Sequence, residues 1–178
     1  MKVVETNIKG CYVIEPNVFG DERGFFLETY QKERYKKLLS INDLFVQDNH
    51  SRSSKNVLRG LHYQKTKPQG KLVRVVSGEV FDVAIDLRKE SSTFGSHFSI
   101  ILSEQNKKQL WIPPNFAHGF QVISDHADFE YKCTSYYDPN DEATILWDDP
   151  DINIDWPNKN PLLSDKDKKG ISFNLIAL

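Results

Sequence analysis

The chain has 178 residues, 39% hydrophobic and 27% charged, with a formal net charge of -2 at pH 7. This composition is typical of a globular protein that buries a real core, and it favours a single domain over residues 1–178. The small net charge offers no overall attraction for nucleic acid, and no apolar run approaches the roughly 20 residues of a membrane-spanning helix, so we expect neither partner.

The first residues lack the long apolar stretch of a secretory signal. Cys11 and Cys133 lack metal-ligand spacing and are the only cysteines of the chain. They indicate buried, reduced thiols in a cytoplasmic protein, and a disulfide between them is the less favoured alternative.

Short strand-like runs separated by turn residues dominate the chain. The helical exceptions are Lys32–Leu39, which carries an apolar stripe, and a short helix expected to begin near Ser164. This pattern predicts an all-β fold, an antiparallel barrel or jelly roll that is open at one mouth, where a ligand would bind. The predicted strands are residues 11–14, 45–50, 56–64, 69–76, 79–87, 97–102, 109–112, 120–123, 129–136 and 143–147.

The clearest alternation lies in residues 79–87. Alternate residues from Phe81 to Leu87 are apolar and are expected to face a core. Asp82 and Asp86 lie on the opposite face, which predicts that this face meets solvent or a polar cavity.

His62 is the first candidate for chemistry because two cations, Arg59 and Lys71, flank it in neighbouring strands. A lone strand histidine is more often a hydrogen-bonded structural residue. Two flanking cations instead favour an anionic, phosphorylated ligand, and a neutral imidazole can accept a proton near neutral pH. The segment therefore predicts proton transfer on a phosphorylated small molecule.

A regular strand would point Arg59 and His62 to opposite faces, since side chains alternate with a period of two. Gly60 lies between them and is a plausible site for a β-bulge. We predict an irregularity there that turns both side chains into one cavity.

Tyr131 is the second candidate. It shares its parity with Phe129 and Cys133, so it is expected to point inward. A buried structural tyrosine is the commoner case. In a barrel that also holds a histidine base, however, an inward phenol is suited to act as the general acid from the opposite wall.

The other histidines give no metal pattern. His118 invites a metal hypothesis with His62, but Gln64 stands where a His-x-His pair needs its second histidine, and no carboxylate follows closely. Metal is therefore disfavoured. Composition gives no reason to choose Asp167 over Asp165. Surface or structural roles are expected for the remaining histidines, His50, His97 and His126.

Taken together, these motifs resemble the dTDP-4-dehydrorhamnose 3,5-epimerase family over nearly the whole chain. The resemblance implies a cupin-type jelly roll, a homodimer, a dTDP-sugar substrate, and neither metal nor organic cofactor. It implies inversion at C3 and C5 of dTDP-4-keto-6-deoxyglucose in dTDP-rhamnose biosynthesis. The matching segments are residues 19–26, 46–49, 58–64, 69–87, 111–121, 131–134, 147–150, 155–157 and 163–167.

Roles carried over from the family give His62 as the base, Asp167 as its orienting carboxylate and Tyr131 as the acid. Lys71 corresponds to the group near the sugar ketone. Tyr137 and Phe19 are candidates to stack on thymine. The implied substrate-binding residues are Arg23, Glu28, Gln47, Asp48, Asn49, Arg59, His118, Glu142 and Lys166.

Three alternatives stay open on the sequence. The enzyme could invert only one carbon, or move the ketone, on a related nucleotide-linked 4-keto-deoxysugar. From a different class, the chain could be a cupin that binds a sugar nucleotide without acting on it.

Overall fold

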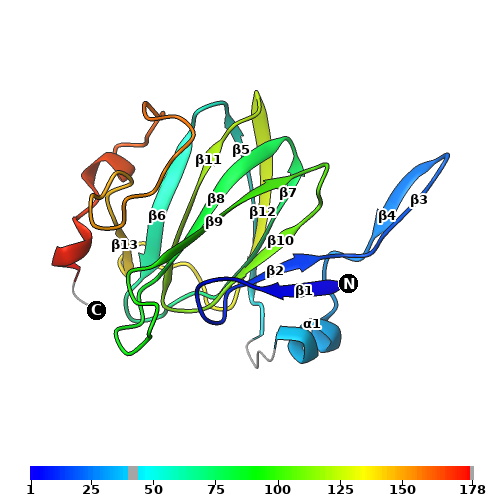
Figure 1. Ribbon diagram of the computed structural model, residues 1–178, viewed down its shortest axis with the longest axis horizontal. Helices are drawn as coiled ribbons and strands as arrows, with labels where there is room; N and C mark the ends of the chain where they lie inside the picture. The colour runs from blue at the N-terminus through cyan, green and yellow to red at the C-terminus, as the bar shows by residue number, and fades with distance from the viewer. Residues whose placement is uncertain (40–43, 177–178) are drawn as a thin grey trace.

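The structure, a computed structural model, describes residues 1–39 and 44–176 and is built around two facing antiparallel sheets (Figure 1). The six-stranded sheet has the order β1-β2-β10-β7-β12-β5, and the five-stranded sheet has the order β13-β6-β11-β8-β9. The expected all-β jelly roll is confirmed.

The strand bounds follow the two sheets. The six-stranded sheet comprises β1 (Lys2–Glu5), β2 (Tyr12–Glu15), β5 (Gln47–Ser54), β7 (Lys71–Ser77), β10 (Gln109–Ile112) and β12 (His126–Cys133). The five-stranded sheet comprises β6 (Leu58–Gln64), β8 (Glu79–Asp86), β9 (His97–Ser103), β11 (Phe116–Val122) and β13 (Glu142–Thr144).

The helices match the sequence well. The helix α1 spans Lys32–Leu39 as predicted, and the expected short helix near Ser164 is the 3₁₀ turn Asp167–Lys169. A second 3₁₀ turn, Phe173–Leu175, was not anticipated. Among the described residues, no helix has the length and apolar character that crossing a bilayer requires.

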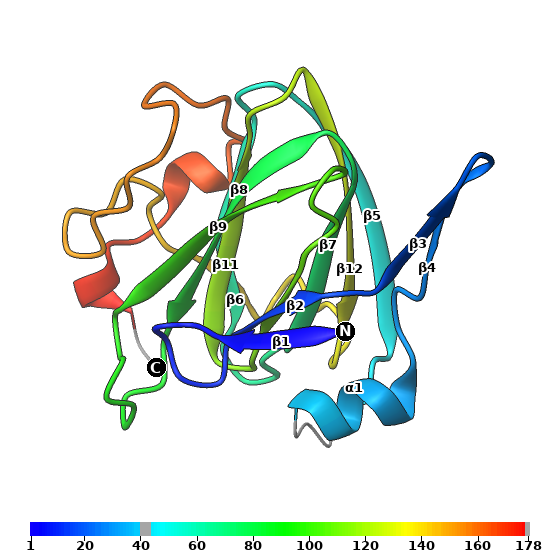
Figure 2. The same ribbon diagram turned by 45° about the vertical axis from the view of Figure 1, so that its right-hand side comes forward.

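The sequence did not reveal a two-stranded arm. Within the described residues, strands β3 (Val18–Asp21) and β4 (Gly24–Leu27) pair only with each other, and they project away from both sheets (Figures 1 and 2). Glycines and charges interrupt the apolar alternation of this segment, which hides the hairpin at the level of pattern.

Three apolar clusters form the layers that position the site. The largest lies between the two sheets and includes Val73, Phe120 and Phe129. The second lies on the outer side of the five-stranded sheet, where the segment around Trp156 covers it. In the third, α1 packs through Tyr35 on the six-stranded sheet. Both sheets are therefore buried on much of both faces.

Burial on both sides corrects the expectation for β8. Val83 and Ile85 of β8 and the following Leu87 belong to the second cluster and Phe81 packs against it, as predicted. The opposite face was expected to meet solvent or a polar cavity, and solvent is excluded because Asp82 and Asp86 are both 0% exposed. The alternation identified the two faces correctly, but a strand covered on both sides can carry buried carboxylates when they are hydrogen-bonded.

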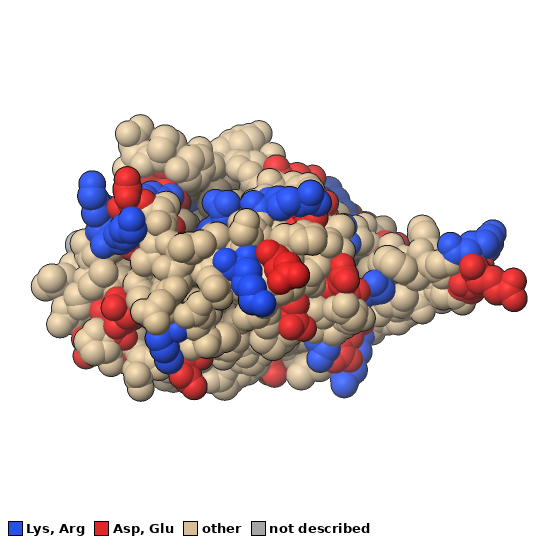
Figure 3. Space-filling view, turned by 90° about the horizontal axis from the view of Figure 1, so that it is seen from above, with Lys and Arg blue, Asp and Glu red and all other residues tan. Residues whose placement is uncertain are grey.

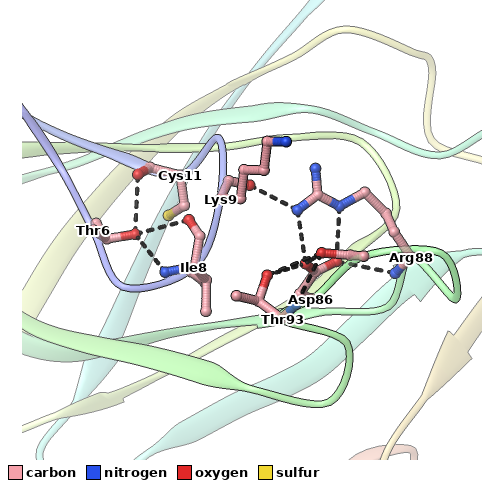
Figure 4. Close-up of polar contacts among 8 residues, drawn as sticks. Thr6, Ile8, Lys9, Cys11, Asp86, Arg88 and Thr93 are labelled. Carbon is pink, nitrogen blue, oxygen red and sulfur yellow. Dashed lines mark hydrogen bonds and ion pairs between the residues drawn. The ribbon is translucent and has the colours of Figure 1, made fainter.

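The buried carboxylate of Asp86 holds two loops together (Figure 4). It accepts hydrogen bonds from the Arg88 guanidinium and from the hydroxyls of Ser91 and Thr93. Arg88 also donates to the carbonyl oxygen of Lys9, which ties the β8–β9 loop to the β1–β2 loop. Burial alone would raise the pKa of Asp86, but these donors lower it to about 2.

Candidate active site

A pocket of about 340 Å³ opens between the two sheets. The strand β6 brings His62 to it from the five-stranded sheet, and β12 brings Tyr131 from the six-stranded sheet. The two candidate groups therefore share one cavity. Its lining residues are Gln47, Asn49, Ser51, Arg59, His62, Gln69, Lys71, His118, Phe120, Phe129, Tyr131, Cys133, Tyr137, Glu142 and Lys166.

A bulge at Gly60 turns Arg59 and His62 into the same pocket, as predicted. Along β11 the pairing passes from His118 opposite His62 to Phe120 opposite Arg59, so β6 carries one extra residue. Gly60 has a φ of 123°, and the peptide bond that follows it is cis. A Cβ atom there would lie 2.6 Å from the Cα of Gly119, so only glycine fits.

His62 is anchored from behind by Asp167. The His62 Nε2 lies 2.5 Å from Oδ1 of Asp167, whose side chain is 3% exposed. The hydroxyl of Ser164 donates to the other carboxylate oxygen at 2.8 Å. Burial would raise the pKa of Asp167, but the His62 and Ser164 hydrogen bonds hold it below its usual range. The imidazole thus keeps Nδ1 for the pocket.

The structure also resolves the choice between two nearby aspartates. The side chain of Asp165 is 90% exposed and pairs only with Lys168 among the described residues. Asp167 opens the 3₁₀ turn that packs against β6, and this places its carboxylate behind His62. Sequence spacing could not show this, since 105 residues separate the two partners.

A second histidine–aspartate pair lies beside the first. His118 is directly opposite His62 in the sheet, and its Nε2 lies 2.9 Å from Oδ2 of Asp82. Burial lowers the pKa of His118, although Asp82 opposes this, and the ring stacks on Phe129. Oδ1 of Asp82 is buried without a hydrogen-bond partner among the described residues.

The opposite wall carries Tyr131, Lys71 and Cys133. Tyr131 points inward, as its parity predicted, and burial raises its pKa to about 12. Lys71 is 8% exposed, and burial lowers its pKa. Cys133 lies directly opposite Lys71 in the sheet, and burial raises its pKa to about 11. The expectation of two buried, free thiols is confirmed.

The rim of the pocket holds a polar cluster around Glu142. Its Oε2 accepts hydrogen bonds from the Lys166 ammonium at 2.7 Å and the Tyr137 hydroxyl at 3.0 Å. Its Oε1 lies 3.8 Å from Nδ1 of His62. Burial would raise the pKa of Glu142, but Lys166 and His62 hold it below its usual range. Arg59 donates to the Ser53 hydroxyl at 2.9 Å.

Four predicted residues lie away from this pocket within one chain. The alternation of β5 turns Gln47 and Asn49 inward and Asp48 outward, where Asp48 pairs with Lys132. The substrate-binding role of Asp48 stays a prediction, since its side chain lies outside this pocket within one chain. Glu28 pairs with Arg34.

The other two lie on the arm. Arg23 binds Asp21 at its tip, and Phe19 is 63% exposed along its length. In Figure 3 the arm extends to the right as a mostly uncharged protrusion that ends in charges of both signs.

Some site residues escaped sequence reasoning. Ser164 was expected only to cap a helix, and Asp82 only to lie on a wet face, yet each contacts a pocket histidine or its carboxylate. Ser51 and Gln69 also line the pocket. The alternation of 47, 49 and 51 along β5 was the available signal for Ser51.

The described residues contain no group of three or more His, Cys, Asp or Glu side chains arranged to hold a metal ion.

Comparison with known proteins finds a matching family profile and relatives that carry the same description. The sequence profile of a family described as dTDP-4-dehydrorhamnose 3,5-epimerase matches residues 5–174. A protein of that name from Shigella flexneri is 55% identical over 174 residues, which cover 97% of this chain and 96% of the relative.

Two solved structures are also similar. One is a dTDP-6-deoxy-D-glucose-3,5-epimerase from Legionella pneumophila in complex with dTDP-4-keto-L-rhamnose. It is 55% identical with a TM-score of 0.97, and the match covers 99% of this chain and 94% of that one. The other is a 3′-monoepimerase from Streptomyces bikiniensis in complex with dTDP-quinovose. It is 30% identical with a TM-score of 0.88, and the match covers 94% of this chain and 85% of that one.

Proposed function

The chain belongs to the dTDP-4-dehydrorhamnose 3,5-epimerase family, and we propose that it inverts C3 and C5 of dTDP-4-keto-6-deoxyglucose. The product is dTDP-4-keto-rhamnose, an intermediate of dTDP-rhamnose biosynthesis. One observation carries the proposal for the mechanism: His62 and Tyr131 line the same pocket from opposite sheets. Inversion requires a base on one face of the sugar and an acid on the other.

The proposed chemistry starts at the 4-ketone, which acidifies the hydrogens on both neighbouring carbons. His62 removes a proton through Nδ1, because Nε2 is held by Asp167. The buried Lys71 stabilises the enolate that forms. Tyr131 then donates its proton from the other face, and its high pKa keeps it protonated until that moment.

The remaining pocket residues bind the substrate in this proposal. Arg59 and Lys166 provide charge-assisted donors for the diphosphate. Tyr137 is half-exposed at the rim and suited to stack on the base. Gln47, Asn49, His118 and Glu142 contact the sugar and the nucleoside.

We further propose a homodimer in which the arm of each subunit completes the partner's pocket. Four large apolar residues of the arm are exposed in the single chain, namely Val18, Phe19, Phe25 and Phe26. Arg23 and Glu28, which the family resemblance implies as substrate-binding, lie on or beside this arm and away from the pocket of their own chain. A second copy would bring them to the site.

A cytoplasmic location is also proposed, supported by two free thiols that suit a reducing compartment. Residues 1–178 are proposed to act as one domain without a metal or organic cofactor. The family match over residues 5–174 supports the single domain.

The test is to incubate the protein with dTDP-4-keto-6-deoxyglucose in deuterium oxide and follow the sugar by NMR. Deuterium at both C3 and C5 is the expected result. Deuterium at one carbon would instead identify a single-carbon epimerase, an alternative favoured by the similarity to a 3′-monoepimerase. Binding without deuterium uptake at either carbon would identify a non-catalytic sugar-nucleotide-binding protein.

A further inference from the structure

We propose that Glu142 takes the proton from His62 between the two inversions and releases it to solvent. This inference rests on the proposed double epimerisation. After one inversion His62 holds the proton of the substrate carbon and Tyr131 has lost its own. Neither group can act at the second carbon until both are reset. A single base that serves two carbons therefore needs a proton exit that works while the sugar is bound.

Among the described residues, the contacts of His62 point to an exit through Nδ1. Its Nε2 is held by Asp167, which is 2% exposed and accepts a hydrogen bond from the Ser164 hydroxyl, so the proton on that nitrogen stays within the histidine–aspartate pair. Its Nδ1 faces the pocket, which the sugar fills. The carboxylate oxygen recorded near Nδ1 is Oε1 of Glu142 at 3.8 Å. A shift of roughly 1 Å would bring the two atoms to hydrogen-bond distance.

Glu142 links this nitrogen to the rim. Its own side chain is 12% exposed, and its Oε2 contacts two groups that reach solvent. Lys166 has a side chain that is 49% exposed, and Tyr137 is 48% exposed. The carboxyl group therefore spans the distance between a covered imidazole and the open mouth of the pocket.

The proton balance is simple. The Nδ1–H bond of the imidazolium breaks and an O–H bond forms on Oε1 of Glu142. That O–H bond then breaks as water takes the proton, and Tyr131 regains a proton from solvent. No electrons change hands, and each reset moves one proton out and one in. An ordinary glutamate titrates about two units below an ordinary histidine, so the protonated form of Glu142 is short-lived.

Substrate binding strengthens this exit. Lys166 is proposed to bind the diphosphate, and when it turns to the phosphate it withdraws a donor from Oε2 of Glu142. Its hydrogen bond and charge are among the causes that hold the pKa of Glu142 low, so the carboxylate becomes a better proton acceptor once substrate is bound.

The test compares Glu142→Gln with the matched control Lys166→Met in the deuterium experiment. Both variants disturb the same rim contact, but only the first removes the proton acceptor. We expect Glu142→Gln to label one carbon and then stall, with uptake at the second carbon at least ~100-fold slower than at the first. A sugar inverted at one carbon should accumulate. Lys166→Met should raise KM while uptake at the two carbons stays matched.

The possible results distinguish a failure of the proposed function from a failure of the proton exit through Glu142. No uptake by the unmodified protein would refute the proposed function itself. Normal double uptake by the unmodified protein together with equal losses at both carbons in Glu142→Gln would refute only the proton exit. The same imbalance in Lys166→Met would also refute it, because substrate placement would then explain the effect.

A second variant, Glu142→Ala, shows whether a defect in folding or binding explains the result for Glu142→Gln. In Glu142→Ala, which leaves room beside His62, added formate should restore uptake at the second carbon. Absence of rescue in a variant that still binds dTDP by calorimetry would count against the proposal.

Discussion

Two histidines on adjacent strands line the pocket, each paired with an aspartate behind it, and the surroundings of the two pairs differ. His62 and Asp167 have side chains 21% and 3% exposed, whereas His118 and Asp82 are 8% and 0% exposed. Nδ1 of His62 faces a cavity with a carboxylate nearby. His118 is stacked on Phe129, and burial lowers its pKa. In this account His62 exchanges a proton with the substrate, while burial favours the neutral form of His118.

This difference shows that the residue pair alone does not define a base. An imidazole becomes a useful base where its charged form is supported by carboxylates and reaches solvent or substrate. The same imidazole in a dry, stacked position serves as a fixed polar contact. In this account His62 performs the chemistry, and His118 orients the sugar.

Among these variants, replacement of the base His62 should lower kcat most. His62→Ala is expected to lower kcat by ~10²–10⁴-fold, because no second base serves either carbon. Binding of dTDP should persist, since the nucleotide contacts lie elsewhere in the pocket. Steady-state kinetics and calorimetry measure the two effects. Near-normal kcat in a folded His62→Ala protein would place the base elsewhere.

Tyr131→Phe removes only a hydroxyl from the opposite wall. Product formation should fall by ~10²–10⁴-fold, because re-protonation loses its donor. Loss of the substrate's hydrogens should fall less, since His62 still works. Rapid-quench NMR compares the two steps. Equal losses in both would indicate a structural tyrosine.

The same substitution in the two pairs should give unequal effects. Asp167→Asn is expected to lower kcat by roughly 100-fold or more, because it removes the charge that orients His62 and stabilises its protonated form. Asp82→Asn should cost about tenfold or less, mainly in KM, because His118 carries no charge in the reaction. Similar kcat losses in the two variants would contradict the division of roles.

A buried aspartate outside the pocket should affect stability and leave chemistry nearly unchanged. The pKa of Asp86 falls from 3.8 to about 2 on folding, which corresponds to about 2 kcal/mol of stability. A lowered pKa means that this stability is full above about pH 4 and is lost as the pH falls toward 2.

Urea unfolding of Asp86→Asn at pH 7 and at pH 3 checks this expectation. The variant should be less stable than the parent at pH 7, and the gap should narrow at pH 3. A constant gap would show that the Asp86 charge contributes little.

Local sequence patterns predicted much of the fold and the residues that point into the pocket from β6 and β12. Alternation identified β8 and the inward direction of Tyr131, and Gly60 marked the bulge that aims Arg59 and His62. These features depend on a few neighbouring residues, so the sequence displays them directly.

Features that depend on distant contacts were less accessible. Asp167 and Asp165 look alike until the tail folds against β6. Whether Asp82 faces solvent or a polar cavity stayed open, because the packing of the opposite sheet cannot be read from β8 alone. The arm was missed because its strands bury little of their own surface within one chain.

The most direct test of the central claim is deuterium uptake by His118→Ala and His62→Ala, measured side by side at saturating dTDP-4-keto-6-deoxyglucose. The account predicts that His118→Ala still labels C3 and C5, whereas His62→Ala labels neither above the background rate. Loss of uptake in both variants, or persistent uptake without His62, would contradict the assignment of the base.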